Sequence, residues 1–129
     1  MKPNAMFIKV LRILLALILL LFSSNGFIGY LSMPQPPAPA ANFLQALSDS
    51  GFVFPLLYGV EFIMGVLILF NRFVPLVVLM FAPIAVNILL YHLFLDPAGG
   101  TAGFLTVLIE VILLVAYFGY YRSLMKPRA

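Results

Sequence analysis

The most informative part of this 129-residue chain is residues 52–95, which read FVFPLLYGVEFIMGVLILF-NR-FVPLVVLMFAPIAVNILLYHLFL. It holds two apolar runs, residues 52–70 and 73–95, and each is long enough to cross the hydrocarbon core of a bilayer, which takes about 20 helical residues. Only Asn71 and Arg72 separate the two runs. Because so short a connection must reverse the chain tightly, the sequence predicts a hairpin of two membrane-spanning helices.

Two further apolar runs of similar length lie outside this hairpin, at residues 10–30 and 102–121. The chain is 64% hydrophobic and only 9% charged, whereas a soluble domain carries roughly 25% charged residues. So few charges cannot cover a water-exposed surface, which argues against a soluble enzyme, a disordered tail and a nucleic-acid-binding module. We therefore predict an all-α membrane protein, a single domain over residues 1–129 that forms a bundle of four transmembrane helices.

The connection at residues 31–51 is the only long one between these runs. Prolines open it and cannot continue a helix, namely Pro34, Pro36, Pro37 and Pro39. After them Phe43, Leu44 and Leu47 recur at helical spacing, and Gly51 is a suitable stop. The pattern predicts a short amphipathic helix at the membrane surface, in the first extracytoplasmic loop.

The basic residues define the orientation of the four predicted spans. Every Lys and Arg falls on one side of the four-span arrangement: Lys2, Lys9, Arg12, Arg72, Arg122, Lys126 and Arg128. Asp49 and Asp96 fall on the opposite side. Cytoplasmic segments of membrane proteins are enriched in Lys and Arg, so both termini are expected in the cytoplasm.

The first run also has a rival interpretation as a secretory signal peptide, because basic residues precede a leucine-rich core. Residues 23–27, SSNGF, offer no clear small-x-small cleavage site, and the APA match at 38–40 lies too far downstream. The run is therefore expected to remain as the first span. The chain has no cysteine, which excludes disulfides and thiolate metal sites within it.

Two glutamates lie within the predicted spans, Glu61 in the second and Glu110 in the fourth. A charged side chain at the centre of a membrane helix costs about 2.5–3.5 kcal/mol on insertion scales, so such residues commonly serve a function. Tyr58 lies one helical turn before Glu61, on the same face. The alternative is that the two carboxyl groups only form hydrogen bonds between helices.

Other polar residues lie near the same depth. At 1.5 Å per residue, Asn87 and Glu110 come out roughly 10–12 Å below the outer boundary and Glu61 roughly 14 Å below it. The hypothesis is a polar pocket that opens outward, in which Glu61 and Glu110 form hydrogen bonds or relay protons while Asn87 and Tyr58 orient a ligand. His92 is a further candidate, although its place at the outer edge is more typical of an interfacial residue. The spacing of His92 and the two glutamates fits no metal-ligand motif, so no metal is expected.

Several runs of the sequence carry a resemblance to a known family: LRILLAL at 11–17, SNGF at 24–27, FLQALSDSGF at 43–52, VEFIMGVLILFNRFVPL at 60–76 and APIAVNILLYHLF at 82–94. In these runs the chain resembles the DoxX family of small bacterial membrane proteins. The most specific part combines Glu61, Gly65 and the Asn71-Arg72 pair with the segment from Asn87 to His92.

The resemblance implies a four-helix bundle in the bacterial inner membrane. Some members of the family are small subunits of membrane thiosulfate–quinone oxidoreductases. The chain is accordingly expected to be an accessory subunit of a quinone-linked redox system, without catalytic activity of its own, with a quinone as the candidate ligand. Its partners would be the lipid bilayer, redox-complex subunits or a second copy, and no nucleic acid. The alternatives are a small-molecule transporter or lipid-binding protein, and a purely structural membrane partner.

Overall fold

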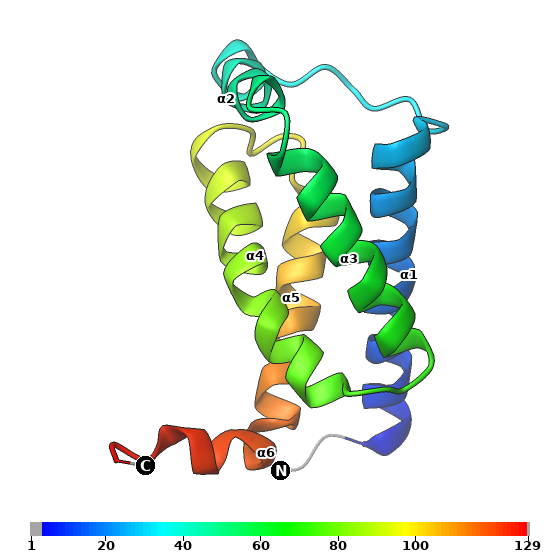
Figure 1. The fold of residues 1–129 in the computed structure, drawn as a ribbon, viewed down its shortest axis with the longest axis vertical. Helices are drawn as coiled ribbons and strands as arrows, with labels where there is room; N and C mark the ends of the chain where they lie inside the picture. The colour runs from blue at the N-terminus through cyan, green and yellow to red at the C-terminus, as the bar shows by residue number, and fades with distance from the viewer. Residues whose placement is uncertain (1–3, 129) are drawn as a thin grey trace.

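The computed structural model describes residues 4–128, which fold into helices without any strand (Figure 1). Four long helices run up and down: α1 (Ala5–Ile28), α3 (Val53–Leu69), α4 (Val74–Phe94) and α5 (Thr101–Ala116). Short helices lie across the two ends: α2 (Ala38–Asp49) at one, and α6 (Phe118–Tyr121) with the 3-10 turn η1 (Arg122–Met125) at the other. The all-helical class is as predicted.

Two of the long helices are individually long and apolar enough to cross a membrane, α1 with 24 residues and α4 with 21. Helix α3 has 17 residues and α5 has 16. Each is joined to a short helix at a sharp bend, 89° between α2 and α3 and 66° between α5 and the α6–η1 segment. The fold therefore provides two membrane-spanning helices, or up to four if each bent pair counts as one span, as expected of a helical membrane protein.

Helix α1 begins and ends at well-formed caps. The Asn4 side chain accepts a hydrogen bond from the Met6 N–H at 2.8 Å, which satisfies one of the unpaired amides of the first turn. At the other end Gly29 is left-handed, with φ +76°, and its N–H donates to the Asn25 carbonyl at 2.6 Å. The Asn4 cap starts the helix at Ala5, five residues before the predicted start.

The structure confirms the tight chain reversal predicted at Asn71 and Arg72, between α3 and α4. Asn71 and Phe73 both adopt positive φ, 58° and 54°. The N–H of Arg72 donates to the Leu67 carbonyl at 2.8 Å. Asparagine tolerates this left-handed conformation better than most residues, which suits Asn71 to so short a reversal.

The fourth predicted span, residues 102–121, is not one straight helix, because the chain bends by 66° near its C-terminal end. Helix α5 ends at Ala116, and the chain then turns into α6. The Tyr121 hydroxyl donates to the Pro75 carbonyl in the first turn of α4, at 2.5 Å, and the Tyr121 side chain is buried there. This bond holds α6 across the start of α4, an arrangement that a straight helix through Tyr121 would not allow.

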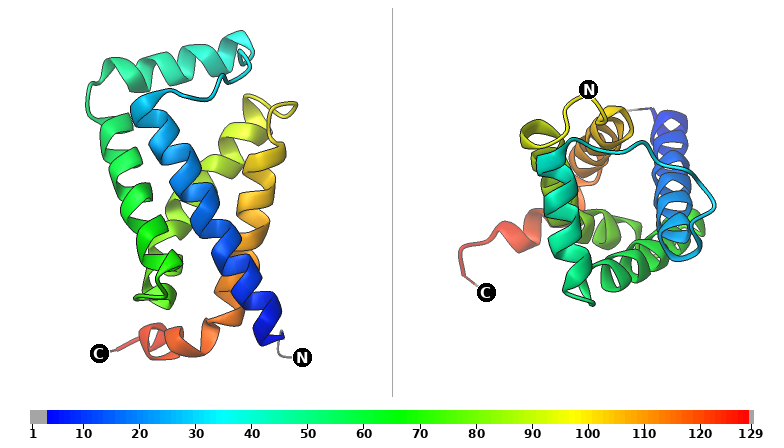
Figure 2. Two further views of the ribbon diagram at one scale, coloured as in Figure 1. Left: turned by 90° about the vertical axis from the view of Figure 1, so that its right-hand side faces the viewer. Right: turned by 90° about the horizontal axis from the view of Figure 1, so that it is seen from above.

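The buried apolar core lies in the half of the bundle away from α2. Its members come from all four long helices: Leu11, Leu15, Ala16, Leu19, Met64, Ile68, Val74, Val77, Val78, Phe81, Ala85, Ile109 and Leu113. Helix α1 packs most extensively on α3, and α4 on α5, while α3 and α4 touch far less. From their shared turn α3 and α4 diverge toward α2 (Figure 2). The bundle is thus closed at one end and open between α3 and α4 at the other.

Charge follows the same division between the two ends. The described basic residues lie at the closed end: Lys9, Arg12, Arg72, Arg122, Lys126 and Arg128. Arg12 donates from its guanidinium to the Ile68 carbonyl at 3.2 Å, where α3 ends. Lys2 lies outside the described residues, and Asp49 and Asp96 lie toward the α2 end. We call these the basic end and the α2 end.

Candidate functional site

A cleft of about 650 Å³ opens between α3 and α4 at the α2 end, and we call it the α3–α4 cleft. Its volume lies in the range of small-molecule sites. Its walls are apolar except for a few side chains, and its lining residues are Phe43, Leu44, Leu47, Val53, Phe54, Leu57, Glu61, Ile84, Asn87, Ile88, Leu90, Tyr91, His92, Phe94 and Leu95. Three predicted site residues, Glu61, Asn87 and His92, therefore share one cleft.

Glu61 and Asn87 line the cleft from facing helices at similar depth. At a rise of 1.5 Å per residue, Glu61 lies about 12 Å below the start of α3 at Val53, and Asn87 about 10 Å below the end of α4 at Phe94. Glu61 is only 8% exposed. The buried carboxyl of Glu61 and the exposed carboxamide of Asn87 thus lie on two walls of a largely apolar cleft, where each offers hydrogen-bonding atoms to a bound molecule.

The position of the Asn87 side chain is tied to Pro83 within α4. Its Nδ2 donates to the Pro83 carbonyl at 2.9 Å. Proline inside a helix has no N–H of its own and disturbs the hydrogen-bond ladder around it. This bond uses one of the two donors of the amide group, so the other donor and the oxygen remain able to form hydrogen bonds with a molecule in the cleft.

His92 is held at the end of α4 by contacts on several sides. Its Nδ1 lies 3.2 Å from the Asp96 carbonyl, and because a carbonyl only accepts, Nδ1 carries the proton. The imidazole lies against Gly103 of α5, edge-on to Tyr91 at 4.9 Å between ring centroids and 5.8 Å from Phe104. These contacts give His92 a part in fastening α4 to α5 as well as a place on the cleft wall.

Helix α2 supplies a roof that the sequence alone did not reveal. Phe43, Leu44 and Leu47 line the cleft, and the Phe43 and Tyr91 rings are 6.1 Å apart. The helical spacing of these three residues predicted an amphipathic helix at the membrane surface but did not show what its apolar face contacts. In the structure these three side chains lie at the mouth of the cleft.

Tyr58 belongs to a different surface of α3 and does not line the cleft. Its ring lies against Gly26 of α1, where a Cβ would come within 2.5 Å of ring carbons. It also stacks on Phe54 at 5.6 Å and meets Phe27 edge-on at 5.8 Å. The structure thus places Tyr58 in the packing between α1 and α3, one turn from Glu61.

Glu110 is also separated from the cleft. It is 1% exposed, and neither carboxyl oxygen has a hydrogen-bond partner among the described residues. A buried polar group without a partner costs free energy, about 1–3 kcal/mol for a neutral one. The carboxyl of Glu110 is therefore enclosed in the bundle, whereas that of Glu61 faces a cavity that a ligand can enter.

No group of three or more His, Asp or Glu side chains within residues 4–128 is placed to hold a metal ion. No family model, curated protein or solved structure matches this chain. The site must therefore be interpreted from its own geometry.

Proposed function

We propose that this chain is a four-span protein of the bacterial inner membrane that binds a small amphipathic molecule in the α3–α4 cleft. In this proposal it serves a quinone-linked redox system as a non-catalytic accessory subunit, with both termini in the cytoplasm. One observation carries the proposal: the cleft is walled by apolar side chains yet has a buried carboxyl, that of Glu61, opposite a carboxamide, that of Asn87.

The span count rests on the lengths of α3 and α5. Their 17 and 16 residues extend about 24–26 Å, somewhat less than a hydrocarbon core of about 30 Å, so each needs its short neighbouring helix to complete a span. A bend before α3 places α2 across one end of the bundle, and a bend after α5 places α6 across the other. Amphipathic segments lie along a membrane interface in this way. The gathering of Lys and Arg at the basic end supports a cytoplasmic location for that end.

The chemistry of the lining favours a neutral ring with hydrogen-bonding oxygens. The remaining Asn87 amide donor can bind a carbonyl oxygen, and the Glu61 carboxyl donates a hydrogen bond when protonated and accepts one in either form. Phe43 and Tyr91 offer aromatic faces beside them. No Lys or Arg lines the cleft, so an anionic molecule would find no permanent positive charge there.

The resemblance to the DoxX family favours a quinone over other molecules of this chemistry. As an accessory subunit the chain would hold the quinone, and a partner subunit would carry out electron transfer. Glu61 and Asn87 are the residues proposed to bind it, and His92 a residue that shapes the cleft wall.

The test is binding of decyl-benzoquinone to the purified protein in lipid nanodiscs. Glu61→Leu and Asn87→Leu are each expected to weaken binding by about tenfold, the loss that follows removal of one hydrogen bond to a ligand. Asp49→Leu and Asn42→Leu are matched controls, because both residues lie on α2 outside the cleft lining. Binding by all four variants that equals binding by the native protein would refute the site, and a solute flux lost in Glu61→Leu would assign a transporter instead.

A further inference from the structure

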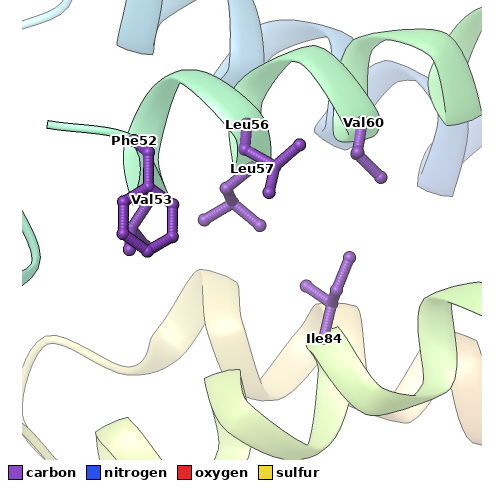
Figure 3. A pocket seen from close by; sticks show the side chains of 6 residues that line it. All are labelled: Phe52, Val53, Leu56, Leu57, Val60 and Ile84. Carbon is purple, nitrogen blue, oxygen red and sulfur yellow. The ribbon is translucent and has the colours of Figure 1, made fainter. Parts of the chain in front are cut away.

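A second hollow of about 320 Å³ lies along the same seam between α3 and α4, and we call it the lateral groove. All its lining side chains are apolar. Figure 3 shows Ile84 of α4 facing a row of side chains on α3: Phe52, Val53, Leu56, Leu57 and Val60. The groove offers no hydrogen-bonding side chain, so it suits a hydrocarbon chain rather than a polar head group.

The lateral groove continues into the α3–α4 cleft. Val53, Leu57 and Ile84 line both hollows. Glu61 follows Leu57 by one helical turn and lies on the wall of the cleft. A single molecule that contacts Glu61 with a polar head can therefore extend an apolar chain past Leu57 into the groove.

The groove also opens on the outside of the bundle. Leu56 is 62% exposed and Phe52 is 65% exposed, which makes its rim part of the apolar outer surface. The opposite approach, from the α2 end, is roofed by Phe43, Leu44 and Leu47. Since α3 and α4 pack less closely than the other neighbouring long helices, the seam between them is the more open route.

We infer that the ligand enters the cleft sideways from the bilayer, between α3 and α4, and that its apolar chain occupies the lateral groove. The inference rests on the proposed function and specifies its ligand as a neutral amphipath with an apolar chain. Neither hollow has a Lys or Arg in its lining, so a phospholipid would leave its phosphate without a countercharge.

The experiment compares two probes, decyl-benzoquinone and the same ring without the chain, with affinities corrected for partition into the nanodisc lipid. Leu56→Trp fills the groove from a residue that does not line the cleft. Ile63→Trp is the matched control, because Ile63 lies two turns further along the same face of α3, is 60% exposed and lines neither hollow.

Leu56→Trp is expected to weaken binding of the decyl probe about tenfold, which corresponds to about two methylene groups that the groove no longer buries. The chainless ring should bind this variant as it binds the native protein, and Ile63→Trp should bind both probes normally. Unchanged decyl binding in Leu56→Trp, with the effect of Glu61→Leu intact, would overturn lateral entry alone. Failure of both probes to bind the native protein, or unchanged binding in Glu61→Leu, would overturn the proposed function itself. Tighter binding of an anionic phospholipid than of the decyl probe would overturn the neutral ligand.

Discussion

At the scale of single residues, identical side chains have different surroundings. Glu61 and Glu110 both lie within apolar helices, but Glu61 lines the α3–α4 cleft, while both oxygens of Glu110 are buried without a hydrogen-bond partner among the described residues. Two glycines of α3 also differ in the space around them. Gly65 lies against α1, where an added Cβ would be 2.8 Å from Leu20 Cγ and 3.2 Å from the Ala16 carbonyl oxygen. An added Cβ at Gly59 would meet no atom within 4 Å.

Gly65→Ala should therefore destabilise the bundle, because the new methyl group would press on the backbone of α1 and push α1 and α3 apart. Overpacking of this kind costs about 1–3 kcal/mol. Gly59→Ala is the matched control on the same helix. It should leave stability unchanged or raise it by roughly 0.5–1 kcal/mol, since alanine favours a helix over glycine. Thermal unfolding in detergent measures both, and equal melting temperatures would show that α1 and α3 do not pack as closely as described.

At the scale of elements, α2 has the clearest role that its sequence did not disclose. It lies across the bundle because the chain bends by 89° into α3, at a corner where Gly51 has φ +82°. Glycine adopts this left-handed conformation without steric cost, so the corner can be sharp. The bend turns the apolar face of α2 toward the diverging ends of α3 and α4, and α2 closes the cleft from that side.

Removing the roof should let water reach the cleft. The chain has no cysteine, so Glu61→Cys, at a buried residue of the cleft wall, can report access through its reaction with a membrane-impermeant maleimide. Adding Leu44→Ala and Leu47→Ala to that variant should raise the labelling rate severalfold, because both leucines line the cleft. Asn42→Ala with Ser48→Ala is the control on the exposed side of the same helix. Labelling that does not change with either pair would mean that α2 is not the barrier.

At the scale of the whole molecule, the buried core and the positive charges are concentrated at the same end of the bundle. The buried core and the described Lys and Arg residues lie toward the basic end, and the cleft opens at the α2 end. Large apolar side chains also remain exposed along the long helices, including Leu14, Ile63, Met80 and Leu108. Such a surface is expected where lipid rather than water surrounds the protein.

Cysteine labelling in intact cells tests the four-span topology. Ser48→Cys on α2 should react with an impermeant reagent directly, and Ser123→Cys on η1 only after the membrane is permeabilised. Phe70→Cys, beside the turn between α3 and α4, is the decisive variant. With four spans it should also need permeabilisation, whereas with α1 and α4 as the only spans it would be labelled from outside.

Features that depend on local order along the chain could be predicted from the sequence alone. The lengths of the apolar runs predicted the long helices, and the Asn71-Arg72 connection predicted the tight turn between two of them. The positions of Lys and Arg distinguished the basic end from the α2 end. The rise of a helix also put Glu61 and Asn87 at similar depths, because depth follows from residue count.

Which faces of the helices meet depends on the tertiary structure. Helical periodicity groups residues on one helix but does not fix its rotation against a neighbour. The sequence therefore did not show that Tyr58 packs against α1, that Glu110 is enclosed away from the cleft, or that Tyr121 bonds to the start of α4. The divergence of α3 and α4, which creates the cleft and its groove, arises from packing between residues far apart in the sequence.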